Sequence, residues 1–182
     1  VIELVLEQLP RDTSGLWSIN LSGQSISEPD FVQKIIEKIH AHGIDPKRLC
    51  FEVTETTAIR SLKDAKLFIA ELRQMGCSIS LDDFGTGLSS FSYLRELDID
   101  YLKIDGSFIR AIAQDPTAQI MVKAIHKVGQ SMGLETIAEF VETDDLRQQL
   151  VDIGVDYGQG YLFSKPIPKE EFEAFALKYA PA

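Results

Sequence analysis

The chain has 182 residues, of which 45% are hydrophobic and 25% are charged, and it carries a formal net charge of −10. These values are ordinary for one globular domain with a proper core, and the acidic balance argues against a surface that binds DNA or RNA. No apolar run approaches the roughly 20 residues that span a bilayer. We therefore expect a cytoplasmic domain that makes no direct contact with a membrane, with two reduced cysteines in its core.

Helices and strands alternate along the whole chain, often with a glycine where a helix ends. The apolar spacing predicts helices over residues 1–9, 27–43, 61–75, 88–97, 117–132, 144–153 and from 168 onward. It predicts strands over residues 17–22, 49–54, 77–80, 101–105, 135–139 and a sixth between 155 and 163.

This alternation indicates parallel strands joined by right-handed crossovers. Such strands form either an open doubly wound sheet or a closed eight-stranded barrel. Polar residues within or at the ends of five successive strands favour the barrel, because only a barrel gathers so many strand ends around one point. These residues are Asn20, Glu52, Asp82, Asp83, Lys103 and Glu139.

Six strands are two fewer than a closed barrel needs. We therefore predict an α/β fold with an incomplete TIM-like (β/α)8 barrel of about six βα units. Because residue 1 already reads as the middle of a helix, we expect the missing first arc to precede Val1.

The adjacent carboxylates Asp82 and Asp83 follow a short strand and precede Gly85 and Gly87. On their own they fit two interpretations. They can act as turn and helix-capping residues, or they can be neutralised by divalent metal ions that one carboxylate bridges. The choice between these depends on the rest of the chain.

Several further motifs stand in one consistent order along the chain. They are Ser18–Ser22 (SINLS), Phe51–Thr56 (FEVTET), Leu81–Gly87 (LDDFGTG), Leu102–Asp105 (LKID), Ala138–Thr143 (AEFVET) and Gly158–Pro166 (GQGYLFSKP). With these motifs, residues 1–182 resemble one EAL domain, a family of phosphodiesterases that act on the bacterial second messenger cyclic di-GMP. The resemblance implies hydrolysis of one phosphodiester bond by a two-metal mechanism, which opens the ring to linear pGpG.

The resemblance also implies a set of site residues. The metal ligands it implies are Asn20, Glu52, Asp82, Asp83 and Glu139. Oxygen ligands of this kind suit two Mg²⁺ or Mn²⁺ ions, and no cluster of histidine or cysteine suggests zinc. The residues it implies for catalysis are Lys103, Glu139, Gln159 and Glu55.

Each of these residues has an expected role. Lys103 orients or deprotonates the attacking water and offsets charge on the phosphate. Gln159 positions that water or a metal-bound one. Asp105 supports Lys103, and Glu55 fixes the neighbouring loop.

Two departures from the family pattern affect these expectations. The Glu-Ala-Leu signature, whose glutamate is a metal ligand in the family, occurs nowhere in the chain, so we expect this fragment to be inactive by itself. Phe140 stands where the family usually has glycine, and a large side chain there could crowd the loop after Glu139.

Three functions compete at this point. The first is a catalytic signalling domain of a larger protein, the second a cyclic di-GMP receptor without turnover, and the third a regulatory or dimerisation module. The expected partners are cyclic di-GMP, a second copy of the chain joined through the barrel, and other domains of the parent protein, which could itself be tethered to a membrane.

Overall fold

The structure is a computed structural model that describes residues 2–9, 15–26, 28, 30–86, 92–168, 170–172 and 174–175. Its helices are α1 (Ile2–Gln8), α2 (Gly23–Ile26), α3 (Phe31–His42), α4 (Glu55–Arg60), α5 (Leu62–Met75), α6 (Gly106–Ala111), α7 (Pro116–Ser131) and α8 (Asp144–Ile153). Its strands are β1 (Trp17–Leu21), β2 (Leu49–Thr54), β3 (Ser78–Phe84), β4 (Tyr101–Ile104), β5 (Glu135–Ala138) and β6 (Tyr157–Gly158), and two short 3-10 turns are η1 (Pro46–Arg48) and η2 (Tyr93–Glu96).

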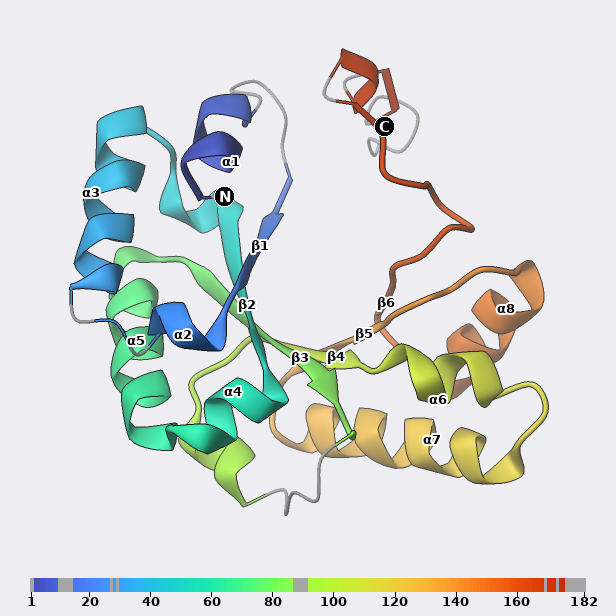
Figure 1. Cartoon of the computed structure of the whole chain (residues 1–182). Coiled ribbons are helices and arrows are strands. Elements are labelled where there is room, and N and C mark those ends of the chain that lie inside the picture. The colour runs from blue at the N-terminus through green and yellow to red at the C-terminus, as the bar shows by residue number, and fades with distance from the viewer. Residues whose placement is uncertain are drawn as a thin grey trace.

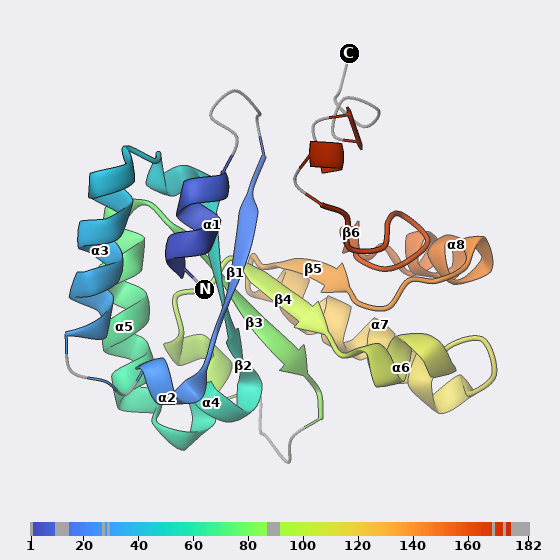
Figure 2. The ribbon, with the colours of Figure 1, turned by 45° about the horizontal axis from the view of Figure 1, so that its top comes forward.

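The six strands form one sheet in chain order, and every neighbouring pair is parallel. The sheet is a curved half-barrel, with α3 and α5 packed together beside its first strands and α7 and α8 beside its last (Figures 1 and 2). This arrangement confirms the prediction of an incomplete barrel of the TIM type. It also places the carboxyl ends of all six strands along one rim.

Burial on both sides of the central strands explains their sequence. Five consecutive residues of β2 are buried, as expected for a parallel strand covered by helices on one face and by side chains of the barrel interior on the other. The helices each contribute one apolar stripe to the same core. The largest fully buried side chains are Phe51, Ile19, Ile35, Ile39, Leu49, Ile69, Leu72, Ile79, Leu81, Leu94, Leu102 and Ile104.

The predicted elements differ from the structure mainly where the segments are short. Helix α8 and strand β2 have the predicted bounds, whereas α2, α4 and α6 were not predicted, since four to six residues are too few to display a helical period. Of the helix expected over 88–97, only η2 is present, and residues 87–91 lie outside the described part. The helix expected from residue 168 also lies largely outside it.

Strand β3 is longer than predicted. It continues to Phe84, so Asp82 and Asp83 lie inside the strand and not beyond its end. The interpretation of the pair as turn residues is therefore wrong for Asp82, which pairs with Thr54 of β2. The helix that the pair could cap is predicted to begin at residue 88, outside the described part. The sheet holds Asp82, and a strand is the more rigid support for a functional side chain. Asp83 instead donates its N–H to Asp82 Oδ1 at 3.0 Å, and its carbonyl accepts from Thr86 Oγ1 at 3.1 Å.

Candidate active site

Strand pairing brings the predicted polar residues to one face of the sheet. Asn20 pairs in register with Glu52, and Asp82 pairs with Thr54, two residues beyond Glu52. Paired residues of parallel strands point to the same face, and so do alternate residues within a strand. Asn20, Glu52 and Asp82 therefore share the inner face of the half-barrel, although Asn20 is exposed there.

Lys103 lies at the centre of this face and contacts carboxylates from β2, from β3 and from the residue directly after β5. Its Nζ lies 2.9 Å from Glu52 Oε2, 3.0 Å from Asp82 Oδ1 and 2.9 Å from Glu139 Oε1. Only 3% of its side chain is exposed. Burial acts to lower the pKa of Lys103, but the surrounding carboxylates, Glu52 foremost, raise it above its usual value, so the ammonium stays protonated at neutral pH.

Asp82, Asp83 and Glu139 form a group of carboxylates of the kind that holds a metal ion. Each offers one oxygen, and these atoms all lie within 4.8 Å of one another. The pKa of Asp83 is raised by partial burial and by the charge of Asp82, and burial likewise raises the pKa of Glu139 against the opposing effect of Lys103. Such a crowded group of hard oxygen donors fits Mg²⁺ or Mn²⁺.

The backbone of β3 is irregular where it presents these carboxylates. Its register against β4 passes from Leu81–Leu102 to Phe84–Ile104, which is three residue steps on β3 against two on β4. Asp83 takes a left-handed conformation with φ of 57°, which non-glycine residues adopt only at a cost. The strain is concentrated at the residue that completes the acidic group.

Glu55 holds the chain that follows this group. Its carboxylate accepts a hydrogen bond from Gly85 N at 3.0 Å and one from the buried Tyr93 hydroxyl at 2.8 Å. Gly85 itself has φ of 103°, and a Cβ there would lie 2.8 Å from the ring of Phe108, so glycine is required. Glu55 thus contacts the chain after Asp83, and its loop-fixing role stays a prediction. Tyr93 was not predicted, because nothing in its local sequence links it to Glu55.

Gln159 and Asp105 occupy positions beside the site, and their roles remain predictions. Gln159 donates its backbone N–H to Ala138 O at 2.8 Å, which places it next to Glu139. Asp105 caps helix α6 by accepting hydrogen bonds from the backbone N–H and the hydroxyl of Ser107. Among the described contacts, its carboxylate binds Ser107 and not Lys103.

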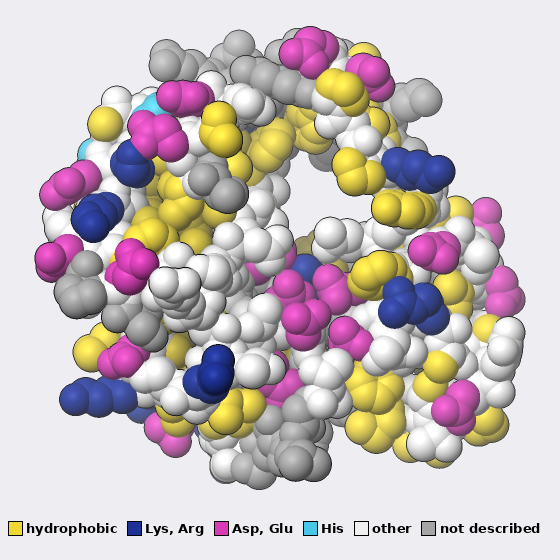
Figure 3. Space-filling model, viewed as in Figure 1, with side chains coloured by type: hydrophobic (Ala, Val, Ile, Leu, Met, Phe, Trp, Pro, Cys, Tyr) yellow, Lys and Arg dark blue, Asp and Glu magenta, His cyan; other side chains and the backbone are white. Residues whose placement is uncertain are grey.

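The space-filling view shows the same organisation. Acidic side chains gather in the middle of the molecule beside a hollow in the half-barrel (Figure 3). Neighbouring side chains along the hollow are mostly uncharged. The half-barrel thus concentrates negative charge at the point where an oxygen-binding cation would sit.

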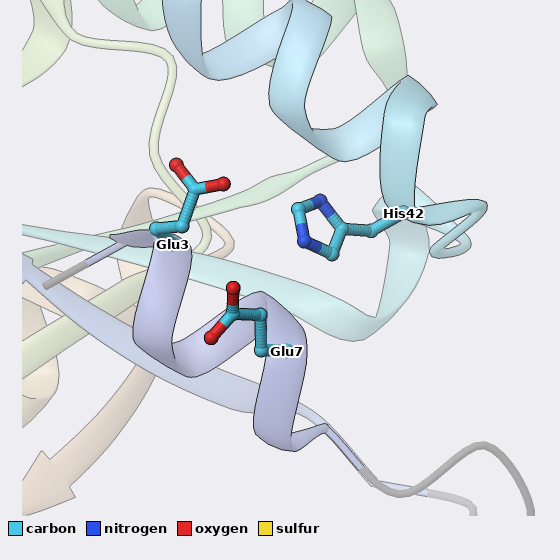
Figure 4. A group of neighbouring side chains, drawn as sticks. All are labelled: Glu3, Glu7 and His42. Carbon is cyan, nitrogen blue, oxygen red and sulfur yellow. The ribbon is translucent and has the colours of Figure 1, made fainter.

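A second group of possible metal ligands lies away from the sheet, on helices α1 and α3. Glu3, Glu7 and His42 point toward one another (Figure 4) and place one ligand atom each within 4.8 Å of the others. Glu3 already forms an ion pair with Lys38, and His42 Nδ1 donates to the Lys38 carbonyl at 2.8 Å. The Lys38 ammonium therefore neutralises Glu3 within this surface group.

Comparison with known sequences decides the family. The profile of the EAL domain matches residues 1–166. The chain belongs to the EAL domain family. One relative of this EAL domain is the cyclic di-GMP phosphodiesterase PdeB of Shewanella oneidensis, which is 42% identical over 173 residues. That alignment takes in 92% of this chain but 20% of PdeB, so the chain spans about a fifth of the length of that relative.

Solved structures agree with this assignment. The PaMucR phosphodiesterase in complex with cyclic di-GMP superposes on the EAL domain with a TM-score of 0.89 at 32% identity, covering 94% of this chain and 71% of that one. A complex of Klebsiella pneumoniae BlrP1 with calcium and cyclic di-GMP gives a TM-score of 0.82 at 32% identity, covering 92% and 42%. None of the described helices of this EAL domain has the length and hydropathy to cross a membrane.

Proposed function

We propose that this EAL domain is the phosphodiesterase unit of a larger cytoplasmic signalling protein and hydrolyses cyclic di-GMP to linear pGpG. The observation that carries the proposal is the group formed by Asp82, Asp83 and Glu139, whose oxygens lie within 4.8 Å of one another on the inner face of the half-barrel. PdeB is a cyclic di-GMP phosphodiesterase by name, and the PaMucR structure contains the same dinucleotide.

The chemistry of the substrate explains why such a group is needed. A phosphodiester is negatively charged and repels nucleophiles, and this protein has a net charge of −10, so the site needs added positive charge. Two Mg²⁺ or Mn²⁺ ions supply that charge when bound and also supply an ionised water as nucleophile. Asp82, Asp83 and Glu139 would hold them, with Glu52 and Asn20 as further oxygen ligands on the same face.

Lys103 contributes a fixed positive charge next to these ligands. Because its carboxylate neighbours raise its pKa, the ammonium orients the attacking water and offsets charge that develops on the phosphate, and it does not remove a proton. Its three ion pairs also keep Glu52, Asp82 and Glu139 close together before any cation arrives. Gln159 and Glu55 assist by placing the water and by holding the chain after Asp83.

A receptor without turnover is the second candidate, and one observation favours it. Lys103 already neutralises part of the negative charge of Glu52, Asp82 and Glu139. A domain whose carboxylates are satisfied in this way could bind the dinucleotide without recruiting metal ions. The two functions differ in whether metal is needed and in whether pGpG appears.

The test uses the full-length protein with Mn²⁺ or Mg²⁺ and cyclic di-GMP, with product analysed by chromatography. We expect pGpG to form and turnover to stop when the ions are chelated. Asp82→Asn should lower kcat by at least about 10³-fold, whereas Asp98→Asn, an exposed position at the opposite end of the sheet, should leave kcat within twofold. Binding that persists after chelation, without any pGpG, would support the receptor.

The larger assembly follows from the same proposal. We propose that a second copy of the chain pairs with it through the barrel and that other domains of a longer polypeptide control it. Sedimentation of the full-length protein tests the dimer, and a single monomeric species at micromolar concentration would contradict it.

A further inference from the structure

Phe140 is held in an unfavourable backbone conformation directly after Glu139. Its φ is 52°, in the left-handed region where a bulky residue is a real outlier. Its side chain is nevertheless 46% exposed, so the strain is not repaid by burying the ring. Strain of this kind is costly and clusters at functional sites.

The ring rests on the first turn of helix α6. A Cβ on Gly106 would lie 2.1 Å from Cδ2 of Phe140, so only glycine leaves room for the ring there. One turn further along the same helix, the guanidinium of Arg110 lies 4.3 Å from the ring centroid. The helix therefore supports the ring with a flat backbone surface and a cation, while a large part of the ring remains open to solvent.

The backbone on both sides of the ring is fixed by the sheet. The N–H of Glu139 donates to Ile104 O at 3.3 Å, and the N–H of Val141 donates to Gln159 O at 3.0 Å. These two bonds attach the residues before and after Phe140 to strand β4 and to the segment after β6. The ring is thus an exposed, rigid aromatic surface whose chain neighbour, Glu139, is one of the proposed metal ligands.

We propose that Phe140 is a stacking surface for one guanine base of the cyclic dinucleotide. The inference rests on the proposed function, since it names how that substrate is held. A flat aromatic ring that needs no rearrangement loses little entropy when a base stacks on it. Because the ring of Phe140 lies beside Glu139, a base can stack on it while the phosphate of the dinucleotide faces the carboxylates of the site.

The first experiment compares Phe140→Gly with Phe140→Trp. Glycine removes the ring and relieves the strain at φ of 52°, so lost binding cannot be blamed on misfolding. We expect the Kd of cyclic di-GMP, measured by calorimetry in Ca²⁺, to rise about 5- to 150-fold in Phe140→Gly and to change less than threefold in Phe140→Trp. In turnover assays the loss should appear in KM more than in kcat.

Arg110→Met is the matched control, because it keeps the ring and removes the cation. We expect its Kd to change by less than threefold. An effect as large as that of Phe140→Gly would mean that the guanidinium, not the ring, binds the ligand, and it would overturn the proposal.

A spectroscopic readout separates stacking from a merely structural role. Trp17 is the one tryptophan in the chain, so Phe140→Trp combined with Trp17→Phe leaves a single indole at the proposed surface. Stacking should quench its fluorescence on addition of cyclic di-GMP, but not of inorganic phosphate. An unchanged spectrum, or a Kd within twofold of the original in Phe140→Gly, would overturn the proposal.

The outcomes also distinguish this inference from the proposed function. If the protein binds cyclic di-GMP through Phe140 but makes no pGpG, the stacking role stands and the catalytic proposal fails. If pGpG forms and Phe140→Gly changes neither Kd nor KM, the catalytic proposal stands and the stacking role fails. Absence of any binding would contradict both.

Discussion

The two ends of the sheet use charged residues in opposite ways. On the inner face, toward the carboxyl ends of the strands, the single ammonium of Lys103 contacts three carboxylates and has Asp83 nearby. At the other end, Arg73 forms ion pairs with Asp100 at 2.5 Å and with Asp98 at 3.4 Å. Asp100 also accepts the backbone N–H of Ile79 at 2.8 Å.

The difference lies in the balance of charge. The Arg73 group is satisfied, because its main carboxylate has a guanidinium and a backbone donor as partners. The carboxylates around Lys103 are not fully neutralised, since several of them share one cation. In barrels of this type the carboxyl ends of the strands carry function and the opposite ends carry stability. Excess negative charge is thus the physical sign that marks the end where we propose the active site.

The largest expected effect comes from removing Lys103. Lys103→Met leaves buried carboxylates without a counter-charge, and we expect a loss of about 3–5 kcal/mol in the free energy of unfolding, measured by thermal denaturation without metal. Added Mn²⁺ should then raise the Tm of this variant more than that of the original protein, because the ion replaces the missing charge. A variant that is as stable as the original protein would show that Lys103 does not relieve the repulsion among these carboxylates.

Removing the acceptor at the opposite end should cost less and leave function intact. Asp100→Ala deprives Arg73 and the Ile79 amide of their partner, and we expect a loss of about 1–3 kcal/mol in chemical denaturation. Turnover should remain within twofold at a temperature where the variant is folded. A large fall in kcat without a fall in stability would assign this end a functional role.

The next effect is the pH dependence of metal binding. Asp83 and Glu139 have raised pKa values, so they retain protons to a higher pH than ordinary carboxyls, and metal binding requires their ionised forms. We expect Mn²⁺ affinity, measured by calorimetry, to fall by about tenfold between pH 7.5 and pH 5. Affinity that stays constant over this range would show that other ligands hold the ion.

The smallest effect is a gain in stability from Asp83→Asn without metal. The folded-state pKa of Asp83 is raised, so the folded protein bears a cost when this group ionises, and that cost is present above the folded-state pKa. Asparagine removes it and tolerates the left-handed backbone. We expect a gain of under about 1 kcal/mol at pH 7, which disappears below the ordinary pKa of 3.8. A loss of stability at pH 7 would be the contrary result.

The sequence predicted the fold well because strand and helix periods repeat over long segments. All six predicted strands are present, and Glu52, Asp82 and Glu139 do converge, as their positions in successive parallel strands required. The short helices α4 and α6 escaped prediction. They are set by local caps, in which Thr54 and Asp105 accept hydrogen bonds from Thr57 N and Ser107 N.

The contacts within the site were harder to predict from the sequence than the residues that form it. The three ion pairs of Lys103 join residues from different strands, so their lengths depend on how strongly the sheet curls. The hydrogen bond from Tyr93 to Glu55 spans 38 residues and has no local signal. Likewise, the left-handed conformation of Asp83 follows from the strand irregularity, which a pattern of apolar residues does not reveal.

The extra residue in β3 has a consequence for how the protein tolerates deletion. Along a regular strand, adjacent residues point to opposite faces, so two neighbouring carboxylates would not meet at one ion. Between Leu81 and Phe84 the register of β3 against β4 shifts by one residue. This shift interrupts the alternation, so that oxygens of both aspartates lie within 4.8 Å of each other. Deleting a single residue there would restore the regular alternation of side chains and turn one carboxylate toward the helices. We therefore expect this part of β3 to tolerate substitutions better than deletions or insertions.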